Sequence, residues 1–110
     1  PGAPLVTLPA TDGKAVIYGL SLAVQIKHNN AVGLAWMVQY RPDATQPWET
    51  VPNTEPWLKN QTTANGITSG AFNYTKPGQW RFQVVSIFPG AQPSAWRSFS
   101  VIKLTPKHKL

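Results

Sequence analysis

The feature that most constrains the fold is an alternation of apolar and polar side chains, which proline and glycine interrupt repeatedly. In residues 20–27, leucine, valine and isoleucine alternate with small or polar residues, and a similar alternation recurs in residues 34–41 and 80–85. Such a period of two places neighbouring side chains on opposite faces of a strand. Eleven prolines and eight glycines in 110 residues argue against long helices. The sequence therefore predicts an all-β domain.

About seven short strands follow from this pattern, at residues 5–8, 20–27, 34–41, 48–51, 67–74, 80–85 and within 95–104. Residues 53–66 are the least regular segment, and we expect a loop with at most one poorly formed strand there. Parallel strands need crossovers of a dozen or more residues, usually helical, and no helical pattern is present. The prediction is an antiparallel seven-stranded β-sandwich of the immunoglobulin-like type, with a small barrel as the structural alternative.

The apolar phase of these strands predicts the core. The expected core residues are Leu20, Leu22, Val24, Ile26, Trp36, Val38, Tyr40, Ile67, Phe72, Trp80, Phe82, Val84, Phe99 and Val101.

A chain of 110 residues is expected to form one domain, which buries roughly two-thirds of its surface. We predict a sandwich over residues 1–104, followed by a basic tail or linker at residues 105–110. The net charge is +6, but among the basic residues only Lys103, Lys107 and Lys109 cluster. Nucleic acid is therefore not an expected partner. No stretch approaches the 18 apolar residues of a membrane span.

Catalytic and metal-binding patterns are missing from the sequence. The chain contains four carboxylates, two histidines and no cysteine, so a disulfide and a thiolate zinc site are both impossible. It has no Gly-x-Ser-x-Gly elbow, no glycine-rich phosphate loop and no His-x-x-x-His pair. We expect a protein that is not an enzyme and that uses no cofactor or metal.

Five tryptophans are many for a chain of this length. Trp36 and Trp80 lie on the apolar phase of their strands, which assigns them to the core. Trp48, Trp57 and Trp96 are the candidates for ligand binding, since aromatic rings stack on the apolar faces of sugars. For Trp57 the alternative is that its ring closes one end of the sandwich.

Trp96 is expected on the outer face of the last strand, because Phe99 and Val101 must point inward. There it would contact the stem of Arg81, with a cation–π interaction worth about 0.5–1 kcal/mol. A loop through Gln92 is expected to place Trp96 opposite Val85. The candidate binding residues are Trp48, Trp57, Arg81, Trp96 and Arg97.

Several segments share strand motifs with one known β-sandwich family. Residues 36–41 are similar to its third strand, with an aromatic-x-Val-x-Tyr-Arg pattern, and residues 48–51 to the short strand that follows. Residues 77–84 resemble the turn and sixth strand, with Trp80 in the place of the usual tyrosine, and residues 93–101 resemble the last strand. By these motifs the chain resembles the fibronectin type III family over residues 34–51 and 77–101.

This resemblance implies a spacer or protein-interaction module within a larger extracellular, cell-surface or virion-surface protein. It implies no particular activity, because the fold hosts unrelated functions. The expected partner is another protein or a neighbouring domain of the parent chain. The alternative is a carbohydrate-binding module whose exposed tryptophans would bind a glycan.

Overall fold

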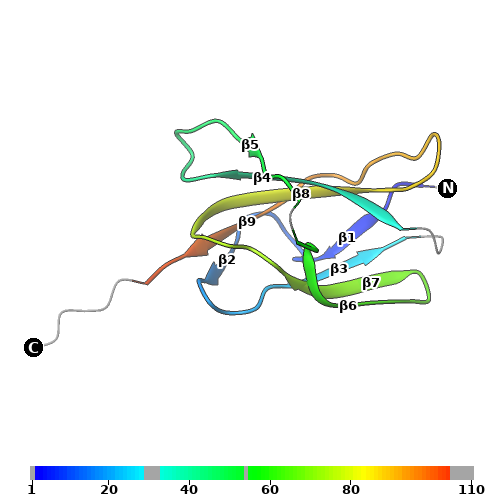
Figure 1. Ribbon diagram of the computed structural model, residues 1–110, viewed down its shortest axis with the longest axis horizontal. Helices are drawn as coiled ribbons and strands as arrows, with labels where there is room; N and C mark the ends of the chain where they lie inside the picture. Colours follow the sequence, from blue (N-terminus) through cyan, green and yellow to red (C-terminus); the bar gives the residue numbers. More distant parts are fainter. Residues whose placement is uncertain (1, 29–32, 54, 105–110) are drawn as a thin grey trace, which may run out of the picture.

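The computed structural model describes residues 2–28, 33–53 and 55–104. Over these residues the chain forms β-strands and no helix (Figure 1). The strands are β1 (Leu5–Leu8), β2 (Lys14–Ile17), β3 (Ala23–Lys27), β4 (Leu34–Arg41), β5 (Glu49–Thr50), β6 (Leu58–Ala64), β7 (Ile67–Phe72), β8 (Gly78–Ser86) and β9 (Arg97–Ile102). The described part contains no helix long and apolar enough to cross a membrane.

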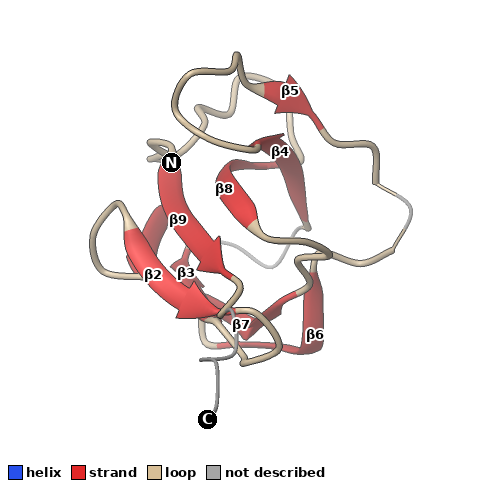
Figure 2. Ribbon diagram, turned by 90° about the vertical axis from the view of Figure 1, so that its left-hand side faces the viewer, coloured by secondary structure: helices blue, strands red, loops and turns tan. Residues whose placement is uncertain are grey.

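The strands form two layers that enclose the core (Figure 2). One sheet has the order β1-β3-β7-β6, and the other has the order β2-β9-β8-β4-β5. The four-stranded order corresponds to strands A, B, E and D of immunoglobulin domains. The prediction of an all-β sandwich is therefore confirmed, whereas the predicted count of seven strands is wrong, because the described residues form nine.

One strand pair is parallel, contrary to the expectation of a wholly antiparallel fold. The chain leaves β1, turns at residues 9–13 and joins the opposite sheet as β2, which pairs in parallel with β9. Because β2 and β9 lie near opposite ends of the sequence, the intervening strands connect them and no helical crossover is needed.

The sequence pattern missed β2 and gave at most a poorly formed strand in the region of β6, since neither strand shows a clear alternation. In β6 only Leu58 is buried, and the six residues after it are exposed. This strand forms the edge of its sheet, where polar side chains are favoured. A strand that contributes one side chain to the core leaves no period of two in the sequence.

Most of the predicted core is buried or partly buried, and two of its members are exposed. Leu20 is 60% exposed, because it lies in the turn before β3 and its backbone N–H donates to the carbonyl of Ile17. Ile67 is 36% exposed, because Thr68 and Phe72 set the inward phase of β7. Residues five positions apart lie on opposite faces of a regular strand, so Ile67 and Phe72 cannot both point into the core.

Phe72 lies at the centre of an aromatic core. The rings of Trp57 and Phe82 stack on it at 5.6 Å and 5.4 Å, and Phe99 meets it edge-on at 5.0 Å. Trp36 is partly buried and packs against this cluster, as does Tyr40. The remaining predicted core residues are buried: Leu22, Val24, Ile26, Val38, Trp80, Val84 and Val101.

The predicted basic tail, residues 105–110, lies outside the described residues. The division into a sandwich over residues 1–104 and this tail stays a prediction.

Candidate interaction surface

The side of the five-stranded sheet that faces away from the core carries alternating glutamine and arginine side chains. Phe82 points into the core, so its neighbours Arg81 and Gln83 point outward. On β4, Gln39 lies directly opposite Arg81, and Arg41 lies opposite Gln79. We call this side of β4, β8 and β9 the outer face.

Two tryptophans lie beside these arginines. The Arg41 guanidinium carbon is 4.2 Å from the centroid of the Trp48 ring, and that of Arg81 is 4.5 Å from the same centroid. Arg81 also lies 4.4 Å from the centroid of the Trp96 ring. Cation–π contacts of this kind are worth about 0.5–1 kcal/mol each at exposed positions. Arg81 therefore links the two half-buried indoles into one cluster.

Glutamines fix the orientation of both guanidinium groups. The Nε atom of Arg41 donates to Oε1 of Gln79 at 2.7 Å, and the Nε atom of Arg81 donates to Oε1 of Gln39 at 2.7 Å. These are the hydrogen bonds that the two guanidinium groups make within the described residues. Their Nη groups therefore keep their donors for another molecule, and these donors have the fork geometry that binds a carboxylate.

Arg81 is positively charged in this environment. Burial lowers the pKa of its guanidinium below the ordinary value, and the positive charge of Arg41 lowers it further. An arginine nevertheless stays protonated at neutral pH. The two like charges face one side of the sheet, and within the described residues no carboxylate pairs with either of them.

A compact turn at residues 43–45 follows β4 and leads the chain back toward Trp48, which lies over the outer face. The carboxylate of Asp43 accepts hydrogen bonds from the backbone N–H of Thr45 at 2.9 Å and from the Thr45 hydroxyl. These bonds lower the pKa of Asp43, the hydroxyl bond more than the backbone bond, and Arg41 contributes a smaller lowering. After the turn, the chain continues into β5, which pairs with β4. Residue 48, directly before β5, therefore lies beside the arginines of β4 and β8.

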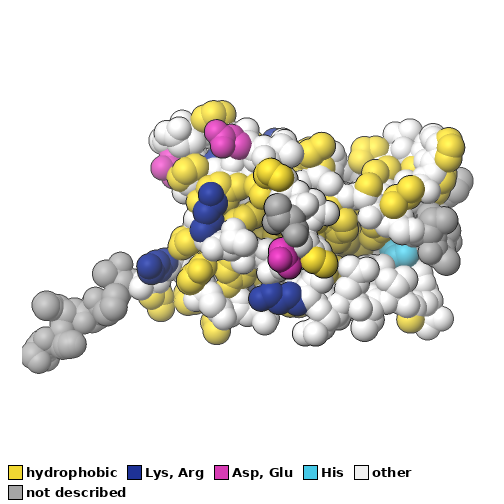
Figure 3. Space-filling model, viewed as in Figure 1, with side chains coloured by type: hydrophobic (Ala, Val, Ile, Leu, Met, Phe, Trp, Pro, Cys, Tyr) yellow, Lys and Arg dark blue, Asp and Glu magenta, His cyan; other side chains and the backbone are white. Residues whose placement is uncertain are grey.

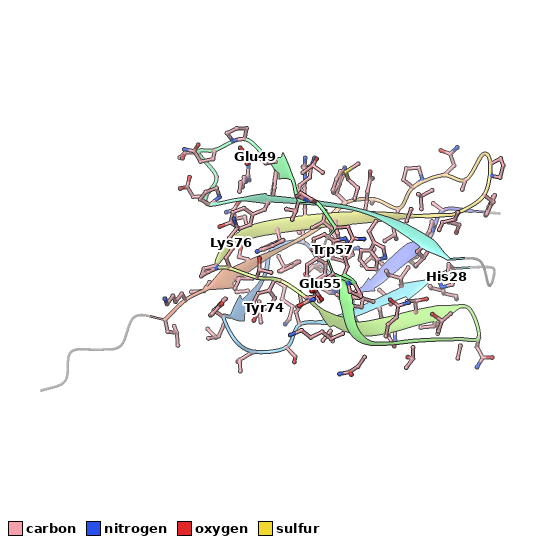
Figure 4. All side chains as sticks on the ribbon, viewed as in Figure 1. His28, Glu49, Glu55, Trp57, Tyr74 and Lys76 are labelled. Carbon is pink, nitrogen blue, oxygen red and sulfur yellow. The ribbon has the colours of Figure 1, made fainter. Side chains whose placement is uncertain are left out.

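Of the five predicted binding residues, the structure brings three together: Trp48, Arg81 and Trp96. Trp57 is 9% exposed and stacks on Phe72 (Figure 4), so its ring is part of the core and offers no open face to a ligand. Arg97 lies apart from the cluster, because its guanidinium donates to the backbone carbonyls of Ala10 and Val6. It thus holds the turn between β1 and β2 against β9.

The register at Trp96 differs from the expected one. Ser94 pairs with Val84 through two hydrogen bonds, and Arg97 pairs with Phe82. Two residues, Ala95 and Trp96, therefore lie across from the single Gln83. The expectation that Trp96 lies opposite Val85 is wrong, because the additional residue at this point changes the register of the segment before β9 against β8. Its place on the outer face, partly covered and near Arg81, is confirmed.

Arg41 is the member of the cluster that sequence reasoning missed. The alternation in β4 placed it opposite in phase to Val38 and hence outward. Its contact with Trp48 depends on the path of residues 42–47, which the strand pattern does not define.

The other groups able to do chemistry are dispersed. His28, Glu49 and Glu55 lie at separate places on the molecule (Figure 4), and the visible lysines and arginines are scattered rather than gathered (Figure 3). Within the described ranges, no three histidine, cysteine or acidic side chains are grouped so that they could hold a metal ion.

Comparison with known proteins gives likeness at the level of fold alone. No family model matches the chain, and no curated protein matches it. Among solved structures, it is similar to the one described as the crystal structure of the RIG-5 IG1 homodimer, with a TM-score of 0.44 and 7% sequence identity. That likeness covers 94% of this chain and 100% of the other. A similarity of this degree carries no argument about binding.

Proposed function

We propose that this chain is a non-catalytic protein-interaction module that binds another protein through its outer face. The module would belong to a larger extracellular or surface protein. The sequence resemblance over residues 34–51 and 77–101 favours a fibronectin type III relationship within the immunoglobulin-like sandwiches.

The observation that carries this proposal is the pair of arginines on the outer face. Arg41 and Arg81 are held by glutamines through Nε, flanked by Trp48 and by one another, and unpaired with any carboxylate of the described residues. Arginine and tryptophan are the residue types most enriched where truncation weakens protein–protein binding. A module that acts only as a spacer would have no need for two arginines held side by side on one face.

The carbohydrate alternative is supported less well by the same residues. A sugar stacks on an open indole face, but Trp57 is buried against Phe72. The guanidinium of Arg81 already occupies part of the ring surface of both Trp48 and Trp96. A glycan would have to displace these contacts.

A site-blocking experiment tests the proposed face. Because the chain contains no cysteine, a maleimide reagent labels only the thiol that is introduced. Ser100→Cys places a thiol on the outer face, opposite Gln79, whereas Ala23→Cys places one on the other sheet, opposite Ala71. Each variant is coupled to a polyethylene glycol maleimide. The probes are peptides selected from a random dodecamer library that is displayed on phage and panned against the full chain.

Peptide binding should be lost when the polymer is attached at residue 100 and retained when it is attached at residue 23. Retention with the polymer at residue 100 would overturn the proposed face, and so would the recovery of no binding peptide. Parallel screening on a glycan array tests the alternative: binding of glycans that is blocked at residue 100 would favour a carbohydrate-binding module.

A further inference from the structure

The outer face changes in character along β4 and β8, from apolar at one end to cationic at the other. Ala35 lies opposite Val85 at the apolar end, and Arg41 lies opposite Gln79 at the other end. Between them, Met37 faces Gln83 and Gln39 faces Arg81. Successive outward rows are two residues apart, so each step along the strands is about 6.6 Å.

The apolar end is hollowed. A depression of about 190 Å³ lies over the outer face there, and its lining includes Met37, Val85 and Pro93. Met37 is 43% exposed, although it is an apolar side chain in the middle of a sheet. For scale, an apolar cavity of about 150 Å³ accommodates benzene. The depression is therefore large enough to receive one aliphatic or aromatic side chain.

The cationic end offers hydrogen-bond donors rather than space. The Nη groups of Arg41 and Arg81 are the ones that the glutamines leave available within the described residues. A carboxylate that approaches them would form charge-assisted hydrogen bonds, which are roughly twice as strong as neutral ones. The indoles of Trp48 and Trp96 flank Arg81 and limit its movement, so that less side-chain entropy is lost on binding.

These two features have a defined separation. Met37 and Arg41 are four residues apart on one strand, which corresponds to about 13 Å. In an extended peptide, side chains at positions i and i+4 also lie on one face about 13 Å apart. An apolar side chain in the hollow would thus place a carboxylate four residues away at Arg41, and the row of Arg81, opposite Gln39, lies two residues nearer to the hollow.

We propose that the partner contributes an extended acidic segment, with an apolar residue that fills the hollow and carboxylates about four residues away that pair with Arg41 and Arg81. This inference rests on the proposed function and names the chemistry of its ligand. A second copy of this chain is a poor occupant, because two outer faces would bring four arginines together. The whole chain has only four carboxylates to set against ten basic residues.

The peptides from the phage selection test this inference through their sequences. The selected sequences should be enriched in peptides with a large apolar residue and an Asp or Glu four positions away, relative to the unselected library. The double variant Arg41→Gln, Arg81→Gln should bind a synthetic peptide of that consensus at least about tenfold more weakly than the wild-type chain does.

The matched control is Lys27→Gln, Lys59→Gln, which removes the same charge from the other sheet. It should change the affinity less than about twofold, and added salt should weaken binding of the wild-type chain. Circular dichroism verifies that both double variants are folded. A variant Met37→Gln, which replaces the apolar side chain of the hollow by a polar one without changing the charge, should weaken binding of the same peptide although both arginines remain.

Two results would overturn the inference. One is a set of selected peptides without enriched acidic residues, and the other is equal weakening by the arginine and lysine variants. If such peptides are still blocked by polymer at residue 100, the outer face remains the binding site and only its acidic ligand is wrong. If they are blocked only at residue 23, the proposed function itself fails.

Discussion

Truncation of Trp80 tests the arrangement of the core most severely. The side chain is 1% exposed, its indole N–H donates to the backbone carbonyl of Lys76 at 3.1 Å, and its ring meets Tyr40, Phe72 and Phe99. Replacing a buried tryptophan by alanine costs about 3–5 kcal/mol. For a small domain this is a large share of a total stability of about 5–15 kcal/mol.

The three aromatic contacts argue for the upper part of that range. Tyr40 meets the Trp80 ring edge-on at a centroid distance of 4.9 Å, and Phe99 lies parallel to it at 6.4 Å. Such pairs add about 0.5–1.5 kcal/mol beyond the burial of their area. Trp80→Phe keeps a ring in place but leaves the Lys76 carbonyl without its donor, so we expect an intermediate loss of about 1–3 kcal/mol.

Urea unfolding followed by far-ultraviolet circular dichroism measures both variants. Trp80→Ala should lower the free energy of unfolding by about 3–5 kcal/mol and the Tm by more than about 10 °C. Trp48→Ala, on the outer face, should lower it by less than about 2 kcal/mol. If Trp80→Ala and Trp48→Ala cost the same, the assignment of inner and outer faces in β8 would be refuted.

Three further predictions concern the packing of β7, the outer face and the turn at residue 43. Gly70→Ala should destabilise the fold by about 1–3 kcal/mol in urea unfolding, because the added Cβ would lie 2.8 Å from the Lys59 carbonyl oxygen; an unchanged midpoint would contradict this close approach. Trp96→Ala should cost only about 1–2 kcal/mol in the same assay, as lost cation–π and cross-strand contacts, whereas a loss above about 3 kcal/mol would indicate a core position. The hydrogen bonds from Thr45 lower the pKa of Asp43 in the folded state, so their stabilisation is present above the unfolded pKa of about 3.9 and is lost as the pH falls through the lower folded pKa. The Thr45 amide proton should therefore keep its chemical shift down to about pH 4 and move only below it, and a transition above pH 4 would contradict the lowered pKa.

Alternation of side chains was sufficient to predict the centre of the fold. The stripe Trp80, Phe82 and Val84 and the pair Phe99 and Val101 are buried as the period of two requires. Leu20 fails for a reason outside this pattern: it shares the phase of Leu22, but the backbone turns before β3 begins at Ala23. Periodicity gives a phase and does not show where pairing starts.

The candidate site was predicted only in part, because some of its contacts are set by strand pairing and others by the shape of a turn. The contact between Arg81 and Trp96 follows from the phases of two adjacent strands, so that the sequence alone could anticipate it. The contact of Trp48 with Arg41 and Arg81 depends on a turn whose shape is set by Asp43 and Thr45. The alternation of side chains in β4 does not predict the shape of that turn.

Trp57 and Trp48 show that the sequence pattern could not distinguish a buried tryptophan from one on the surface. Trp57 lies in the irregular segment 53–66 and Trp48 begins the short strand expected at residues 48–51, and both were candidates for ligand binding. One enters the interior beside Phe72, and the other lies over arginines on the outer face. An aromatic residue in an irregular segment, or at the first position of a short strand, has too few alternating neighbours to fix its phase, so only the folded chain distinguishes the two.

The indole N–H signals of the tryptophans provide the most direct test of binding through the outer face. In a ¹⁵N–¹H correlation spectrum, each of the five tryptophans gives one such signal, which single Trp→Phe substitutions assign. On titration with a peptide selected from the phage library, the signals of Trp48 and Trp96 should shift, because they lie beside Arg41 and Arg81. Those of the buried Trp57 and Trp80 should stay in place. Shifts of Trp57 and Trp80 without shifts of Trp48 and Trp96, or saturation of binding with no shift at Trp48 and Trp96, would contradict the account.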